Sequence, residues 1–111
     1  MLGKHPQVTV QIEANLQWMV ARDPQSGLWI AVCPPLNLNA MGETWGEVLQ
    51  AANEAVLLLM CDLFEEGELE SFLQQHSWRA DKPLPPKSAR PRFDVPFSME
   101  RSDISQIAAL N

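Results

Sequence analysis

The longest run of alternating apolar and polar residues lies near the start of the chain, over residues 8–20. Every even-numbered position in this run is apolar, and the odd-numbered positions between them are mostly polar. Alternation of period two is typical of a strand that buries one face. A hairpin turning at Ala14 and Asn15 would pair apolar with polar positions, so the pattern favours one long strand, straight or bent. Such a strand would reach about 43 Å, and one end of it could project and pair with another chain.

Three shorter patterns predict further strands. Residues 28–33 are apolar on both faces, as expected of a central strand. Alternation over residues 36–41 predicts the next strand, and alternation over residues 93–97 predicts a last, short one. Pro96 has no N–H to give to a ladder, so this last strand is expected at a sheet edge.

A helix is predicted from Trp45 onward. Thr44 and Glu47 have the spacing of a capping box, in which each side chain accepts a backbone N–H of the first turn. A core stripe follows at helical spacing: Val48, Leu49, Ala52, Ala55, Val56, Leu59 and Leu63. Further apolar residues after Ala55 widen this stripe, which predicts cover from a second helix or a second subunit. Gly67 ends the pattern, and a short helix is expected to run from there to about His76.

These elements predict an α+β fold, with a three- to four-stranded, mainly antiparallel sheet packed on one long helix. Residues 1–78 form the main part of the domain. Residues 79–92 contain four of the nine prolines and five basic residues, which indicates a linker. Residues 93–111 are expected to complete the same domain with a strand and a short helix, whose apolar positions are Ile104, Ile107 and Leu110.

The charge of the chain is unevenly distributed. The net charge is −6, yet residues 23–78 contain nine acidic residues and no Lys or Arg. An acidic middle repels the phosphates of nucleic acids. It would attract a basic partner and speed the encounter, or it would serve only to keep the protein soluble; the sequence leaves both interpretations open.

Several features bear on the compartment. No apolar run approaches the ~20 residues that a membrane span needs, since the longest, residues 55–64, is interrupted by Asp62. The first residues lack the apolar segment of a signal peptide, so a cytoplasmic protein is expected. Cys33 and Cys61 show no metal-binding spacing. They are interpreted as reduced core thiols, with a disulfide between them left open.

One stretch of the chain resembles a known family. The family pattern is an aromatic residue, Ala, Cys-Pro and Leu at fixed spacing, then a short strand, Gly-x-Thr-x-x-Glu and Glu-Ala. The matching residues are Trp29, Ala31, Cys33, Pro34, Leu36, Gly42, Thr44, Glu47, Glu54 and Ala55. In this respect residues 16–66 resemble the HicB family of bacterial antitoxins, whose N-terminal domain has a reduced RNase H-like fold. Many members add a C-terminal DNA-binding module, but the residues from Phe93 onward are too few for one, so DNA binding is not expected.

The chain offers little for catalysis. RNase H chemistry needs several carboxylates that converge on metal ions, whereas the first strands offer only Glu13 and Asp23, far apart. His5 and His76 have no partner at ligand spacing. We therefore expect no enzyme activity, no cofactor and no metal.

The resemblance implies a small, basic, RNA-cleaving HicA-like toxin as the partner, blocked by an acidic surface of this chain. The predicted toxin-facing residues are Glu43, Trp45, Glu47 and Glu54. Trp45, an aromatic flanked by acids, would be a binding hot spot or would instead fasten the helix to the sheet. Leu57, Leu58 and Cys61 are predicted to mediate self-association into a dimer or larger homo-oligomer. The alternative function is a non-catalytic, homo-oligomeric structural module without a toxin partner.

Overall fold

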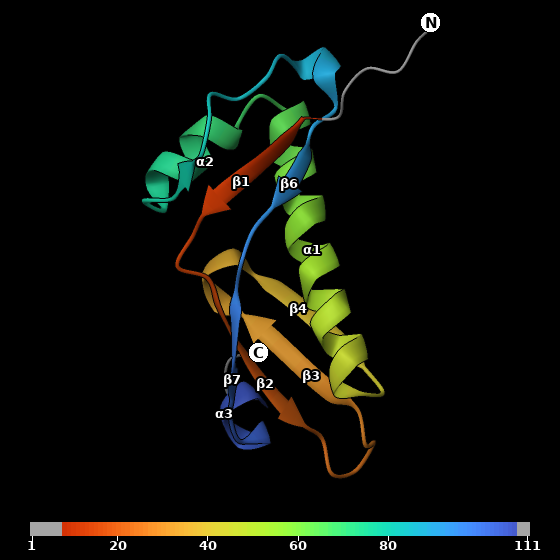
Figure 1. Ribbon diagram of the computed structural model, residues 1–111. Helices are drawn as coiled ribbons and strands as arrows, with labels where there is room; N and C mark the ends of the chain where they lie inside the picture. The colour runs from red at the N-terminus through yellow and green to blue at the C-terminus, as the bar shows by residue number, and fades with distance from the viewer. Residues whose placement is uncertain (1–7, 109–111) are drawn as a thin grey trace, which may run out of the picture.

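The computed structural model describes residues 8–108 and confirms the α+β fold (Figure 1). The strands are β1 (Thr9–Glu13), β2 (Gln17–Arg22), β3 (Trp29–Cys33), β4 (Leu38–Gly42), β5 (Arg79–Ala80), β6 (Arg92–Asp94) and β7 (Ser98–Arg101). The α-helices are α1 (Trp45–Glu65), α2 (Leu69–Gln75) and α3 (Ile104–Ala108). Two single 3-10 turns, η1 (Pro34–Leu36) and η2 (Lys87–Ala89), complete the order.

The strands form two sheets rather than one. The larger sheet has the order β4-β3-β2-β7 and is antiparallel except for the β2–β7 pair. The smaller sheet has the order β5-β1-β6. The long helix α1 runs past both sheets (Figure 1). The predicted mainly antiparallel sheet on one long helix is therefore found in the larger sheet, and the smaller sheet was not predicted.

The run over residues 8–20 is not one strand, and in this respect the prediction is wrong. It divides into β1 and β2, which belong to different sheets, although the apolar alternation survives the break: Val10, Ile12, Leu16, Trp18 and Val20 are all buried. The reason lies in the parallel neighbours β6 and β7. Val10 pairs with Phe93, and Trp18 pairs with Met99. The two paired positions are therefore eight residues apart in the first segment (β1 and β2) and six residues apart in the second (β6 and β7). Two extra residues in the first segment interrupt the ladder and split both segments.

The predicted last strand over residues 93–97 is also wrong in its bounds: only residues 93–94 lie in a strand, β6, and residues 95–97 lead to β7, which was not predicted. Each of these two strands lies at the edge of its sheet, as expected beside Pro96. Within the described residues, β1 pairs with β5 on one side and with β6 on the other, and the expected pairing of a strand end with another chain stays a prediction. The segment 79–92, predicted as a linker, contains β5 and η2. A two-residue strand is too short to leave a periodic signal in the sequence.

The middle of the chain follows the predictions closely. The predicted central strand is β3, which lies between β2 and β4. The following strand begins at Leu38 rather than at Leu36, because η1 and the left-handed Asn37 (φ 55°) come first. Helix α1 begins at Trp45 behind a complete capping box. The N–H of Glu47 donates to Thr44 Oγ1 at 3.1 Å, and the Glu47 carboxylate accepts the N–H groups of Glu43 and Thr44.

The buried stripe of α1 differs from the predicted one. It consists of Val48, Ala52, Val56, Met60 and Phe64, which are four residues apart. At about 100° per residue, steps of four rotate the buried side by roughly 40° each. The stripe therefore turns from the larger sheet near Val48 toward the smaller sheet, where Phe64 meets Phe93 of β6 at 5.7 Å between ring centroids. Leu49 is 40% exposed, while Leu59 and Leu63 are only partly buried.

The second face of the larger sheet has a small core of its own. Ile107 of α3 packs there on Ala21 and Val32. This confirms a final helical turn through Ile104 and Ile107; Leu110, the third predicted position, lies outside the described residues. Helix α3 lies on β2 and reaches Val32 of β3, whereas Met41 of β4 on the same face is 61% exposed.

Candidate protein-binding surface

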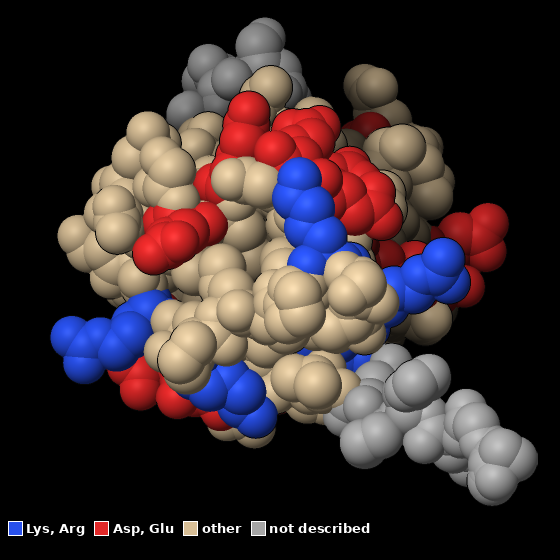
Figure 2. Space-filling model, turned by 90° about the horizontal axis from the view of Figure 1, so that it is seen from above, with Lys and Arg blue, Asp and Glu red and all other residues tan. Residues whose placement is uncertain are grey.

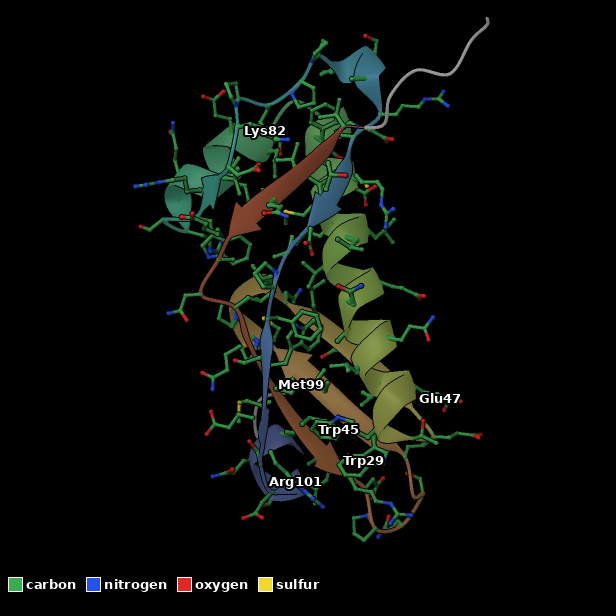
Figure 3. The ribbon with its side chains drawn as sticks, viewed as in Figure 1. Trp29, Trp45, Glu47, Lys82, Met99 and Arg101 are labelled. Atoms are coloured by element: carbon green, nitrogen blue, oxygen red, sulfur yellow. The ribbon has the colours of Figure 1, made fainter. Side chains whose placement is uncertain are left out.

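The four predicted toxin-facing residues are all exposed, but they do not form one surface. Glu47 and Glu54 follow Trp45 by two and nine residues, which places both of them about 160–180° around α1 from Trp45. Figure 3 shows Glu47 and Trp45 on opposite sides of the helix. Helical phase alone contains this information, so the separation could have been found from the sequence once the helix was assigned.

Trp45 lies against the larger sheet. Its ring meets the edge of Trp29 from β3, with 5.3 Å between centroids and planes at 85°. The Arg101 guanidinium of β7 lies over the Trp29 ring at 5.1 Å (Figure 3). Trp45 remains 39% exposed. This packing is what the alternative interpretation of Trp45, fastening the helix start to the sheet, requires.

The two glutamates on the other side of α1 have different local roles. In Glu47, one carboxylate oxygen serves the cap: Oε2 accepts the N–H groups of both Glu43 and Thr44. Glu54 is two turns further on, and its carboxylate accepts one hydrogen bond from the exposed Gln50 amide at 3.2 Å. Glu54 is therefore free to meet a partner without loss of a structural contact, whereas Glu47 is tied to the helix start.

The residues predicted for self-association lie beside these acids. Leu58 is 64% exposed, whereas Leu57 and Cys61 are only partly exposed. Glu47, Glu54, Leu58, Cys61 and Glu65 all fall within about 60° of one another around α1, and we refer to them as the acidic side of α1. Glu47 and Glu54 of the predicted toxin-facing set thus share one side of α1 with Leu58 and Cys61 of the predicted self-association set.

The C-terminal end of the acidic side is approached by basic residues from the late segment of the chain. Lys87 and Arg90 line a cavity of about 380 Å³ together with Cys61, Phe64, Glu65, Pro91 and Phe93. The Lys87 ammonium also lies next to Gly67, just beyond the end of α1. Figure 2 views this end of the molecule and shows acidic side chains gathered there with basic side chains beside them. The basic segment therefore partly compensates the acids at this end of α1.

The two cysteines are free and have raised pKa values. Burial raises the pKa of the Cys61 thiol, and the negative charges of Glu65 and Asp62 raise it further. Burial also raises the pKa of Cys33, partly offset by a backbone hydrogen bond from Leu36. Both thiols are thus protonated at neutral pH and poorly suited to act as nucleophiles.

A larger cavity of about 630 Å³ was not indicated by the sequence. It lies beside the start of β2 and the end of β3, and its lining includes Gln17, Cys33, His76, Trp78 and Glu100. The His76 ring packs on Phe72 and Trp78, and Glu100 accepts a hydrogen bond from Gln17. Within residues 8–108, no group of three or more His, Cys, Asp or Glu side chains is placed to hold a metal ion. Over the same residues, every helix is too short or too polar to cross a bilayer.

The fold and this surface define a small α+β protein with an acidic, partly apolar helix side. Comparison with protein-family models, with curated proteins and with solved structures finds no significant match for this chain.

Proposed function

We propose that this chain is a HicB-like antitoxin or a stand-alone relative, which binds and occludes a small, basic, RNA-cleaving protein. The observation that carries the proposal is the acidic side of α1, where the exposed Leu58 stands between carboxylates. The motif resemblance over residues 16–66 supports the same function. The protein would act in the cytoplasm, where its partner would meet RNA.

The chemistry of this side suits a basic partner. Helix α1 contains no Lys or Arg, so Glu54 has no oppositely charged neighbour on its own helix. Carboxylates around an apolar residue attract a basic surface over a distance and then let an apolar contact anchor it. Leu58 is the residue placed to give that anchor. Trp45 is not part of this surface, because it packs on Trp29 on the other side of the helix.

Occlusion follows from the charge of the partner. A protein that cleaves RNA must present basic side chains to phosphates. The same basic surface is the one that the acidic side of α1 would cover, so binding and inhibition become a single event. The alternative, self-association through this side, is less favourable because two copies would bring carboxylates against carboxylates.

The test is capture of the partner with the full chain as bait in cells of its source. The expected result is a small basic protein that cleaves RNA alone and loses this activity when the chain is added. Glu54→Lys should weaken its binding by about tenfold or more, since an attraction becomes a repulsion. Glu70→Lys is the matched control, because Glu70 is also exposed but lies on α2.

Three outcomes would contradict the proposal: capture of no basic protein, unchanged RNA cleavage by the bound partner, or equal weakening by Glu54→Lys and Glu70→Lys. The Glu47→Lys variant is not a useful test of the surface, since it also removes the capping box.

A further inference from the structure

The two edges of the larger sheet differ in charge. Its edge strands are β4 and β7. Strand β7 carries Glu100 and Arg101, whereas β4 carries no charge, and the whole segment of residues 28–42 is uncharged. Charged side chains on an edge strand discourage pairing with another chain, and an uncharged edge invites it. Only the β4 edge of this sheet is therefore suited to continue the ladder.

An apolar row leads across the sheet to this edge. On the face that carries α3, Ala21 of β2 is next to Ile30 of β3, which is next to Met41 of β4. Exposure rises along the row: Ala21 is 2% exposed, Ile30 is partly buried and Met41 is 61% exposed. Since α3 lies on β2, the row is covered at one end and bare at the β4 edge.

We propose that a second copy of this chain pairs with β4 in antiparallel orientation, with Ala40 of the two copies opposite each other. In this register Asn39 of each copy faces Met41 of the other, and Leu38 faces Gly42. Asn39 and Met41 point to the same face of a strand, so the two Met41 side chains lie diagonally across the junction. The apolar rows of the two copies then join into one, and the exposed methionines are covered.

The charge of the chain favours a second copy at this edge over a basic partner. Each copy carries a net charge of −6, so two copies repel one another, and this repulsion is smallest where they meet through an uncharged surface. The β4 edge provides one. A basic partner would find no carboxylate on this strand and would be drawn instead to the acidic side of α1.

The size of the contact sets the expected affinity. A five-residue strand is only about 17 Å long, so the contact falls near or below the ~1,200 Å² at the lower end of specific interfaces. We therefore expect a reversible dimer with micromolar dissociation. Added salt should tighten it, because salt screens the repulsion between two acidic chains; binding of a basic partner should instead weaken with salt.

The test is sedimentation velocity of the full chain over a range of micromolar concentrations. Two variants set like charges opposite each other at the junction: Asn39→Lys with Met41→Lys, and Asn39→Glu with Met41→Glu. Each alone should dissociate at least about tenfold more readily than the wild type, which corresponds to a difference of about 1.4 kcal/mol. Mixed, the two should form a heterodimer, because residue 39 of one copy then meets an opposite charge at residue 41 of the other.

Leu58→Lys is the matched control, because Leu58 is 64% exposed and Met41 is 61% exposed, on different surfaces. This variant should dimerise as the wild type does. The proposal is overturned if the wild-type chain stays monomeric at high micromolar concentration, if the doubly lysine-substituted chain dimerises unchanged, or if the oppositely charged variants do not combine. Circular dichroism checks that each variant is folded. If a double variant does not fold, the single variant Met41→Lys or Met41→Glu of the same charge is measured in its place.

Discussion

The two ends of α1 are held in different ways. At the N-terminal end, Thr44 and Glu47 close a capping box, and Gly42 lies directly beneath the first turn. At the C-terminal end there is no basic residue in the last turn, and the chain leaves the helix through Gly67 with φ 75°. Backbone N–H groups of Gly67 and Glu68 donate to Phe64 and Leu63 and close the last turn, while the side chains that contact this end, Phe93 and Lys87, come twenty or more residues later. Side chains of the first turn thus close the cap at one end, whereas the side chains that reach the other end belong to a distant segment.

The difference matters for stability and for function. Short-range contacts form without a fold, whereas the Phe64–Phe93 contact requires that β6 is already in place beside β1. The acidic side of α1 extends over both halves of the helix. Glu54 and Leu58 therefore keep their positions on one side of the helix only while the contacts at both ends of α1 are formed.

The largest expected effect is at the distant contact. Phe64→Ala should lower the free energy of unfolding by about 3–5 kcal/mol, because an almost fully buried ring is removed and a cavity is left. Urea denaturation measures the loss. Hydrogen exchange should show faster opening of the C-terminal half of α1 than of the capped half.

A double-mutant cycle sharpens this prediction. Phe93→Ala should cause a similar loss, and the double variant should lose less than the sum of the two, because each ring packs against the other. Strict additivity would show that the two rings do not stabilise each other, and uniform exchange along α1 would show that the two ends of the helix are not held independently.

The difference between the ends also explains what the sequence could predict. The helix start at Trp45, the central strand β3 and the exposure of Glu54 and Leu58 depend on signals within a few residues. The buried stripe beyond Val56 was misassigned, because Met60 and Phe64 are chosen by the smaller sheet that lies beside them. That sheet could not be predicted from the sequence. Its strand β5 is two residues long, and the break between β1 and β2 depends on two extra residues opposite β6 and β7.

The binding surface could be predicted only in part, because some of its features depend on local sequence and others on the arrangement of the whole chain. Which residues are acidic and exposed follows from the sequence, but the packing of Trp45 on Trp29 required the place of the helix on the sheet. The uncharged β4 edge was equally hidden, since strand order, and with it the edge, is a property of the whole chain.

The next largest effect is at the N-terminal end. A Cβ on Gly42 would lie 2.5 Å from the Val48 backbone nitrogen and 2.8 Å from the Glu47 carbonyl carbon. Backbone atoms cannot move aside as a side chain can, so Gly42→Ala should lower the free energy of unfolding by about 2–3 kcal/mol. Thermal and urea denaturation measure the change.

Gly46→Ala is the control for this prediction. Gly46 is in the first turn of the helix, and apart from its chain neighbours and the helix backbone the nearest atom to an added Cβ is Thr44 Oγ1, 3.9 Å away. Since Ala is a better helix former than Gly, the substitution should stabilise the protein by up to about 1 kcal/mol. The same chemical change four residues apart should thus have opposite signs, and equal signs would mean that the close approach of Gly42 to α1 is not present in solution.

The smallest effect is at the cap itself. Thr44→Ala removes the oxygen that accepts the Glu47 N–H and should lower the free energy of unfolding by about 1 kcal/mol. Thr44→Ser keeps that oxygen and should change stability little. Glu66→Ala is the counterpart at the other end, where the C-cap residue contributes a backbone N–H to Asp62 and Phe64 and no side-chain hydrogen bond is found, so it too should have little effect. If Glu66→Ala proved as damaging as Thr44→Ala in urea denaturation, the C-terminal end would also depend on its own local side chains, and the contrast between the two ends of α1 would be wrong.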